Sequence, residues 1–170
     1  MSGEAAVLVL FRTGPRGVEV LFIRRAQREG DPWSGQISLP GGRRDPEDLD
    51  LQATALRETE EEVGLDATVL EGPPVFAGVR APANRPSLHV GVFLAVLQDG
   101  SRAEAHSSPE ADEVFWAPLH ELCASDREVE VSTPRGPWRA EGFHFQGHVV
   151  WGLTRRILLD VLARYGSELS

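Results

Sequence analysis

Acidic side chains crowd the short segment Arg57-Glu58-Thr59-Glu60-Glu61-Glu62. On an α-helix, which advances about 100° per residue, Glu58, Glu61 and Glu62 share one face at spacings of three and four residues. Like charges at these spacings repel one another by roughly 0.2–0.5 kcal/mol per pair, so a bound cation would relieve them. Oxygen ligands without a nearby His or Cys cluster favour magnesium or manganese over zinc. The alternative interpretation is an exposed acidic face that keeps the protein soluble.

Two neighbouring features favour a metal site over a solvated face. Pro40-Gly41-Gly42 interrupts the regular backbone just upstream, and a glycine break lets backbone carbonyls approach a metal ion that helix carboxylates already hold. Arg57 lies beside the acidic stripe, where its guanidinium is placed to orient a carboxylate or to contact phosphate oxygens. The segment therefore predicts a catalytic site that includes Arg57.

A helix must position these carboxylates, and the sequence marks both of its ends. Pro46 and an aspartate cap, either Asp48 or Asp50, predict its start, and Gly64 directly after Val63 predicts its end.

Short apolar runs on both sides of this helix predict a fold rich in β-strands. Two runs flank a Gly-Pro-Arg-Gly turn near the N-terminus and predict a hairpin, and helical spacing near the C-terminus predicts an amphipathic helix packed on the sheet. The expected strands cover residues 5–11, 18–23, 36–39, 69–79, 88–97, 114–116, 128–131 and 138–145, with a Pro-rich loop over 80–86, a helical turn over 118–123 and the final helix over 149–165.

Composition predicts one domain over residues 1–170, because 41% hydrophobic residues suffice for a single core. The formal charge of −9 disfavours binding to duplex nucleic acid.

No apolar run approaches the roughly 20 residues that span a bilayer, and the first residues lack the basic segment of a secretion signal, so we expect a cytoplasmic protein without membrane contact. All 17 basic residues are arginine, so a cationic phosphate contact must come from Arg or protonated His. The single cysteine, Cys123, is interpreted as a small buried apolar residue.

The segment from Gly35 to Leu65 resembles the Nudix hydrolases. Their signature is Gly, five residues, Glu, seven residues, then Arg-Glu-hydrophobic-x-Glu-Glu-x-Gly-hydrophobic. Residues 57–65 match its second half except that Thr59 replaces the aliphatic residue. In the first half, five residues separate Gly42 from Asp48, which stands where the family has Glu, and eight residues rather than seven separate Asp48 from Arg57. The resemblance implies an α/β (α+β) fold in which a mixed β-sheet is sandwiched between helices.

The same resemblance implies a set of ligands for Mg²⁺ or Mn²⁺. Glu58, Glu61 and Glu62 would bind the ion through their carboxylates, and Gly42 would add its carbonyl. The cofactor implied is a divalent cation, and the partner implied is a small-molecule pyrophosphate substrate. A homodimer is compatible with the sequence.

The general base is less closely defined, because members of the family differ in where it lies. Glu58 or Glu62 would take the proton of the attacking water, or a carboxylate on a later loop would do so. Glu110, in Ser-Ser-Pro-Glu-Ala-Asp-Glu, is the candidate for that loop carboxylate, with Glu113 and Glu104 as rivals. The alternative for Glu110 is a solvated residue in an acidic turn.

The approach to the motif resembles the coenzyme A pyrophosphatase branch of the family. In that branch a Gly lies four residues before Phe-Pro-Gly-Gly, as Gly35 lies before Leu39 and Pro-Gly-Gly here. Leu39 replaces the usual Phe, and Asp31 stands where the branch has an Arg, so Arg28 is the candidate to replace that phosphate contact. We expect hydrolysis of a pyrophosphate linkage in a nucleoside diphosphate derivative, coenzyme A or a derivative first.

The alternatives are other Nudix substrates, namely ADP-ribose, NADH, dinucleotide polyphosphates and nucleoside triphosphates, or a noncatalytic Nudix-fold binding module. Substrate selection is expected outside the catalytic helix. Arg80, Asn84 and Arg85 on the Pro-rich loop are candidate selectors, and Trp33 is a candidate to stack on a base. The alternative for each is a side chain that solvates or anchors its loop.

Overall fold

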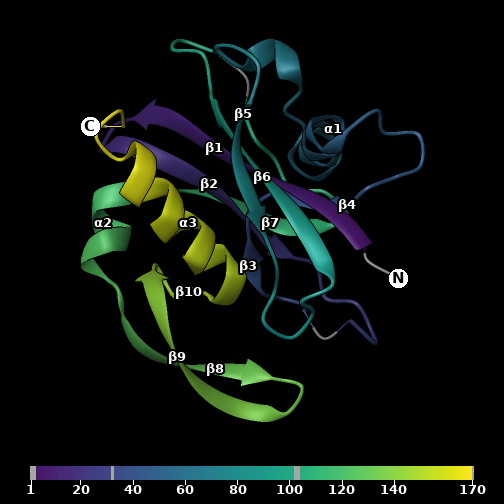
Figure 1. The fold of residues 1–170 in the computed structure, drawn as a ribbon. Coiled ribbons are helices and arrows are strands. Elements are labelled where there is room, and N and C mark those ends of the chain that lie inside the picture. Colours follow the sequence, from purple (N-terminus) through teal and green to yellow (C-terminus); the bar gives the residue numbers. More distant parts are fainter. Residues whose placement is uncertain (1–2, 32, 102–103, 170) are drawn as a thin grey trace.

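The computed structural model describes residues 3–31, 33–101 and 104–169. Within these residues the chain forms two β-sheets and three α-helices (Figure 1). The strands are β1 (Gly3–Gly14), β2 (Gly17–Arg25), β3 (Ile37–Ser38), β4 (Gly41–Arg43), β5 (Val75–Arg80), β6 (Leu88–Val96), β7 (Ala111–Pro118), β8 (Arg127–Thr133), β9 (Gly136–Phe145) and β10 (His148–Trp151). The helices are α1 (Leu51–Val63), α2 (Leu119–Ala124) and α3 (Gly152–Tyr165), with a 3₁₀ turn over Ala67–Val69.

The larger sheet is mixed. Its strands follow the order β3-β2-β1-β6-β5, while β4 pairs with β1 and β7 pairs with β2. β1 and β6 run parallel from the pair Gly3 and Leu88 to the pair Phe11 and Val96, whereas the other neighbouring strands of this sheet run antiparallel. The smaller sheet has the order β10-β9-β8 and contains the second predicted hairpin.

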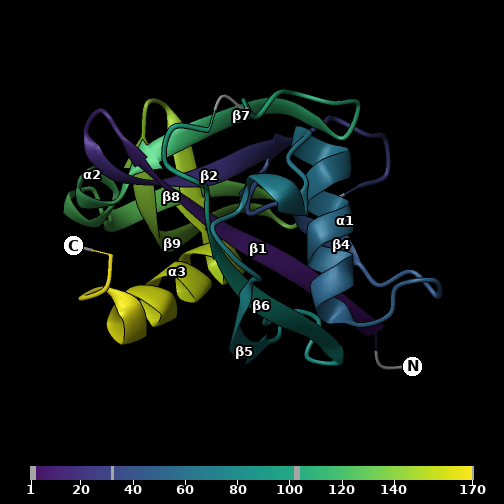
Figure 2. The same ribbon diagram turned by 90° about the horizontal axis from the view of Figure 1, so that it is seen from above.

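The helices cover opposite faces of the larger sheet, as Figure 2 shows for α1 and α3. Alternate residues of a strand point to opposite faces. On β1, Leu8 and Leu10 therefore share one core with Ala55 of α1, whereas Val9 shares the other core with Ile157 of α3. This arrangement confirms the predicted sheet between helices.

The predicted ends of the catalytic helix are confirmed. The Asp50 side chain accepts a hydrogen bond from the Ala53 N–H at 2.8 Å and caps the first turn. Gly64 ends the helix with a φ of 76°, a left-handed conformation that favours glycine. Of the two aspartates proposed as the cap, Asp50 is therefore correct, and Asp48 is left to contact the site.

Three local predictions are wrong. The final helix begins at Gly152 rather than 149, because residues 148–151 pair with β9 as β10 and bury Val150. The strand predicted from residue 69 begins only at Val75. Cys123 is exposed, because α2 directs Leu119 and Leu122 into the core and the next residue points away from it.

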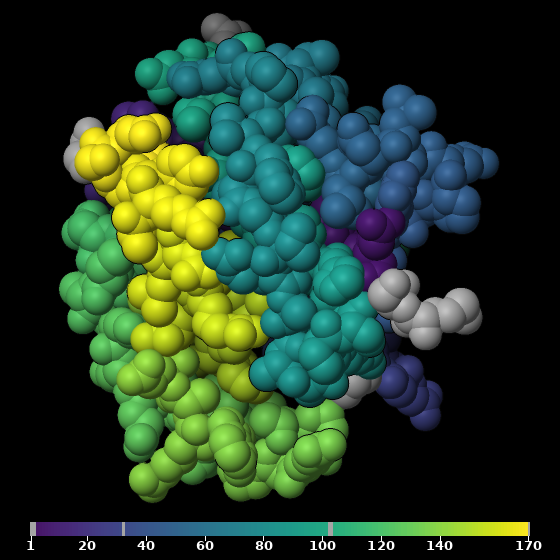
Figure 3. Space-filling model, in the orientation of Figure 1, coloured from purple at the N-terminus to yellow at the C-terminus, as the bar shows by residue number. Residues whose placement is uncertain are grey.

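Figure 3 shows α3 lying across one face of the molecule, beside the β5–β6 hairpin and above the smaller sheet. Among the residues that the structure describes, no helix has both the length and the apolar character needed to cross a bilayer.

Candidate functional site

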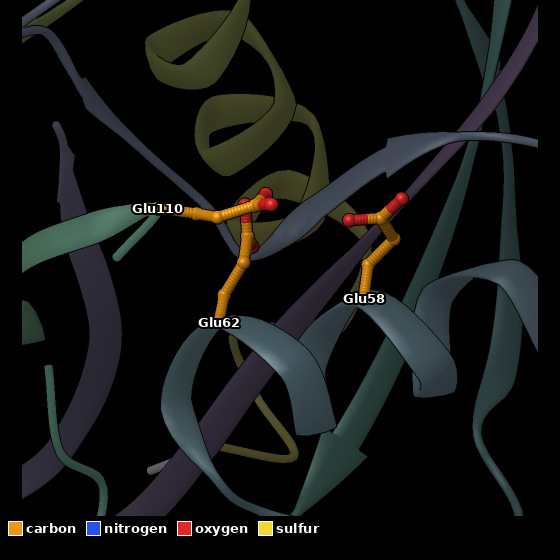
Figure 4. Close-up of side chains that lie close together, drawn as sticks. All are labelled: Glu58, Glu62 and Glu110. Atoms are coloured by element: carbon orange, nitrogen blue, oxygen red, sulfur yellow. The ribbon is translucent and has the colours of Figure 1, made fainter. Parts of the chain in front are cut away.

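Three carboxylates converge at one end of the larger sheet (Figure 4). Glu58 and Glu62 extend from successive turns of α1, and Glu110 reaches them from the residue just before β7. One oxygen atom of each lies within 4.8 Å of the others. Glu62 is buried, Glu58 is partly buried and Glu110 is exposed, so the group opens to solvent on the Glu110 side.

Two glycines of β4, Gly41 and Gly42, lie against these carboxylates. The N–H of Gly41 donates a hydrogen bond to Glu62 Oε2 at 2.9 Å. A Cβ atom on Gly42 would lie 2.4 Å from Glu58 Cδ, so a side chain there would displace the Glu58 carboxylate from its position. The predicted backbone break is therefore a short paired strand, β4, and its close approach to the helix is the feature that the glycines permit. Sequence reasoning missed the Gly41 N–H, and the carbonyl role of Gly42 stays a prediction.

Burial makes the ionised carboxylates unfavourable without a cation. Burial, with the neighbouring Glu58 carboxylate in addition, raises the pKa of Glu62 to about 8 against the opposing Gly41 hydrogen bond. Burial also raises the pKa of Glu58, although Arg57 opposes that change. A divalent cation would favour the ionised form of both groups, and the converging oxygen atoms are donors that hard cations prefer. The residues present therefore fit such an ion.

Arg57 holds three carboxylates at once. Its Nε and Nη2 atoms donate to the two oxygens of Asp48, each at 2.9 Å. Its Nη1 atom donates to Glu58 at 3.1 Å and to Glu61 at 3.2 Å. These hydrogen bonds hold the pKa of Asp48 well below its usual range, because the guanidinium favours the ionised carboxylate. Asp48 thus reaches Arg57 despite the longer spacing, and Arg57 fixes the orientation of Glu58.

Glu61 lies outside the group of three. Its side chain is 52% exposed and faces Arg57. On a helix, Glu58 and Glu62 differ by about 40° in direction, whereas Glu61 is rotated by about 60° from Glu58 to the other side. Among the described residues the carboxylates grouped within 4.8 Å are those of Glu58, Glu62 and Glu110, and the role of Glu61 as a metal ligand stays a prediction.

Backbone contacts place Glu110 at the group. Its carbonyl accepts a hydrogen bond from the N–H of Ala26, which directly follows β2, at 3.0 Å. The Ser108 hydroxyl accepts hydrogen bonds from the N–H groups of Glu110 and Ala111. The loop before β7 is therefore hydrogen-bonded to the end of β2 at Glu110, the residue whose carboxylate joins the group.

The two rivals of Glu110 lie elsewhere. Glu113 forms ion pairs with Arg24 at 3.1 Å and with His148 at 2.9 Å. Glu104 is exposed and does not belong to the group of three. The geometry therefore favours Glu110 among the three loop glutamates.

The candidate substrate contacts divide between the two sides of the sheet. Arg28 Nη2 lies 3.6 Å from Glu110 Oε1, and Trp33 belongs to the same loop after β2. Arg80 instead pairs with Asp160 of α3, on the face opposite α1. Asn84 and Arg85 lie in the connection between β5 and β6 that follows Arg80. The structure therefore brings Arg28 to the carboxylates but does not bring Arg80 to them.

Sequence reasoning missed one arginine beside the site. Arg25 is the last residue of β2, and its charge acts to lower the pKa of Glu62. Its Nη2 atom donates to Asp31 Oδ2 at 3.1 Å. The available signal was strand alternation, because Leu21 and Ile23 face α1 and Arg25 continues their series.

Comparison with known proteins agrees with this geometry. Residues 1–140 match the sequence model of the NUDIX domain. The chain is 31% identical over 166 residues to Nudix hydrolase 15, mitochondrial, of Arabidopsis thaliana, a match that covers 92% of this chain and 56% of that protein. It is 33% identical over 159 residues to the uncharacterised Nudix hydrolase NudL of Photorhabdus laumondii, covering 91% of this chain and 81% of the relative.

Solved structures show the same fold. A MutT/nudix family protein from Enterococcus faecalis superposes with a TM-score of 0.67 at 18% identity, over 98% of this chain and 63% of that one. The NUDIX domain of Shewanella oneidensis NrtR, complexed with ADP ribose, superposes with a TM-score of 0.60 at 19% identity, over 95% and 86% of the two chains. This chain thus spans little more than half of the Arabidopsis protein and under two thirds of the Enterococcus chain. The match over residues 1–140, the identity to named Nudix hydrolases and the shared fold together establish that the chain belongs to the Nudix family.

Proposed function

We propose that this protein is a Mg²⁺- or Mn²⁺-dependent pyrophosphohydrolase that cleaves the pyrophosphate linkage of a nucleoside diphosphate derivative. The observation that carries the proposal is the convergence of Glu58, Glu62 and Glu110 against a glycine strand. Pyrophosphate esters are inert in water because their anionic oxygens repel a nucleophile. A site of this kind removes that obstacle by gathering positive charge beside the phosphates.

When bound, a divalent ion neutralises phosphate charge and makes a water molecule more acidic. Glu58, Glu62 and Glu110 hold the ion in this proposal, with Glu61 and the Gly42 carbonyl as further ligands from the family pattern. Arg57 keeps the Glu58 carboxylate turned toward the site through its Nη1 atom. Glu62 is already fixed by the Gly41 N–H.

One of the carboxylates also accepts the proton of the attacking water. Glu110 suits this role because its side chain is half-exposed and approaches from outside the helix. Glu58 and Glu62 are the alternatives, since each lies within the same group. A positioned base of this kind contributes about 10²- to 10⁴-fold to the rate.

The first substrate proposed is coenzyme A or a derivative, on the resemblance of residues 35–42 to the branch that cleaves it. ADP-ribose is the second candidate, because the NUDIX domain of Shewanella NrtR was crystallised with ADP ribose. Cytoplasmic location and a homodimer stay predictions from the sequence.

A panel of substrates with products resolved by mass tests the proposal. The panel contains coenzyme A, ADP-ribose, NADH, diadenosine polyphosphates and nucleoside triphosphates, each with Mg²⁺ or Mn²⁺. Cleavage within a pyrophosphate linkage gives two phosphorylated fragments, whereas a nucleoside triphosphate pyrophosphatase releases inorganic pyrophosphate. A folded protein that binds nucleotide but turns over no member of the panel with either ion would be a binding module instead.

The Glu62→Gln variant tests the site itself. A neutral amide is a poor ligand for a hard cation and cannot take a proton, so we expect kcat to fall by about 10²-fold or more while the fold persists. Glu60→Gln is the matched control, because Glu60 lies on the same helix with an exposed side chain outside the group. Equal rates for the two variants, with equal melting temperatures, would remove Glu62 from the site.

A further inference from the structure

The Arg25 guanidinium is only partly satisfied. Its Nε atom is buried and has no hydrogen-bond partner within the part of the chain that the structure describes. Its Nη2 atom meets Asp31 Oδ2 at 3.1 Å, and 39% of the side chain is exposed. A planar guanidinium favours two-point contacts with an anion. Arg25 instead holds Asp31 through one nitrogen, so the present contact uses little of its donor capacity.

Arg25 lies at the same corner of the sheet as the carboxylate group. Arg25 continues the series of β2 residues that face α1, and its charge acts on buried Glu62. The next residue along the chain, Ala26, donates its N–H to the carbonyl of Glu110. The guanidinium is therefore tied to the same corner of the sheet as the carboxylate group, with part of its surface open to solvent.

The Asp31 carboxylate makes hydrogen bonds both to its own loop, after β2, and to Arg25. Its Oδ1 atom accepts the Trp33 N–H at 3.0 Å, while Oδ2 accepts from Arg25. Burial disfavours the charged form of Asp31, but the Trp33 and Arg25 hydrogen bonds outweigh this effect and lower its pKa. A second arginine of this loop, Arg28, has a similar weak contact with Glu110 at 3.6 Å. Arg25 and Arg28 therefore each face one carboxylate near the site, Asp31 and Glu110 respectively.

We propose that the Asp31 carboxylate competes with a substrate phosphate for Arg25, so that Arg25 binds substrate and Asp31 lowers the affinity for it. The inference rests on the proposed function for its ligand class, a pyrophosphate compound. Asp31 offers Arg25 only its Oδ2 atom, because Oδ1 accepts the Trp33 N–H. Each phosphate of a pyrophosphate linkage presents two non-bridging oxygens that share a negative charge, so it can form the two-point contact that Asp31 leaves unmade. Asp31 then swings from Arg25 while its Oδ1 atom keeps the loop hydrogen bond to Trp33.

The Asp31→Asn variant separates the charge from the loop contact. The amide oxygen still accepts the Trp33 N–H, but the negative charge opposite Arg25 is gone. We expect KM for the best substrate of the panel to fall by roughly fivefold to tenfold, with kcat within about twofold of the unchanged protein. Asp66→Asn is the matched control, because Asp66 accepts the Thr68 N–H in a similar turn and has the same effect on net charge. An unchanged or raised KM for Asp31→Asn would overturn the proposal.

The Arg25→Gln variant tests the other partner. We expect KM to rise by about tenfold or more, and Asp31→Asn to give no further gain in the Arg25→Gln background. A gain from Asp31→Asn of the same size in both backgrounds would overturn the proposal. If Arg25→Gln fails to fold, Arg25→Lys replaces it, because a lysine keeps the charge but loses the planar fork.

Calorimetric binding of α,β-methylene ADP with Mg²⁺ distinguishes failure of this inference from failure of the proposed function. This compound carries a bridged pair of phosphates that cannot be hydrolysed. Tighter binding by Asp31→Asn and weaker binding by Arg25→Gln, in a protein that cleaves no substrate, would sustain the inference and reject only the hydrolase. Affinities that do not change in either variant would reject the inference, whatever the activity.

Discussion

Glu110 and Glu113 illustrate how much depends on the surroundings of a single carboxylate. Both lie in one acidic segment before and within β7, yet Glu110 reaches the helix glutamates, whereas Glu113 pairs with Arg24 and forms a hydrogen bond with His148. The irregularity in the β2–β7 pairing separates them, because Glu113 pairs with Arg24 within the ladder, whereas Glu110 precedes β7 and its carbonyl accepts from the Ala26 N–H. The role of a glutamate therefore depends on where its side chain points, and the residue type alone does not determine that role.

Replacement of each of these two glutamates makes that difference measurable. Glu110→Gln should reduce kcat by about 10²-fold or more, because the group loses a charged oxygen donor and a candidate base. Glu113→Gln should leave kcat within about threefold, since its partners lie outside the carboxylate group. Steady-state kinetics with saturating Mg²⁺ decide the matter, and full activity in Glu110→Gln would return the role of base to Glu58 or Glu62.

At the scale of elements, the short strand β4 determines how closely the sheet approaches α1. Gly41 has a φ of 154°, and a Cβ atom there would lie 2.2 Å from the Ala6 carbonyl oxygen and 2.7 Å from Val7 Cα. Those atoms belong to the backbone of β1, so they cannot move aside as a flexible side chain would. The strand therefore needs glycine at this position to pair closely with β1, and that pairing places the Gly41 N–H against Glu62.

The Gly41→Ala substitution should consequently destabilise the fold by about 2–4 kcal/mol, through backbone overlap added to conformational strain. Gly136→Ala is the matched control, because Gly136 has a φ of 104° with nothing within 4 Å of its added Cβ atom. Strain alone should cost that variant about 1–2 kcal/mol. Urea unfolding measures both, and equal losses would show that the contact with β1 is not limiting.

At the scale of the whole molecule, burying Glu62 links folding to proton and metal binding. The pKa of Glu62 rises from 4.5 to about 8 on folding, first through burial. Between these two pH values the folded protein binds more protons at this group than the unfolded chain does. The stabilising contribution of the protonated group is therefore fully present below about pH 4.5 and is lost as the pH rises toward 8.

Mg²⁺ should reverse this trend, because an ion that binds the carboxylates displaces the proton. We expect the rise in melting temperature on adding Mg²⁺ to be larger at pH 8 than at pH 6, by an amount on the order of a few kcal/mol in unfolding free energy. Thermal unfolding at both pH values, with and without the ion, measures this difference. In Glu62→Gln the pH dependence should largely disappear, and its full persistence there would assign it to other groups.

The features that could be predicted from the sequence alone depend on residues that lie close together in the chain. The cap at Asp50, the stop at Gly64 and the four-residue spacing of Glu58 and Glu62 all depend on neighbours in the chain, since helix ends and helix faces are local properties. The hairpin β1–β2 is likewise defined by apolar runs around one turn. The dense pattern from Gly35 to Leu65 also identified the family, which the match over residues 1–140 then confirmed.

Only the tertiary structure decided which distant residues join the helix. Glu110 and Arg25 lie at the same corner of the sheet because β7 pairs with β2 up to Arg25, with a register shift between Arg24 and Arg25, and the Ala26 N–H bonds the Glu110 carbonyl. Pairing with β9 turned residues 148–151 from predicted helix into strand, and an ion pair with Asp160 placed Arg80 against α3, away from the carboxylates. These outcomes follow from long-range strand pairing and burial, which no short segment of sequence encodes by itself.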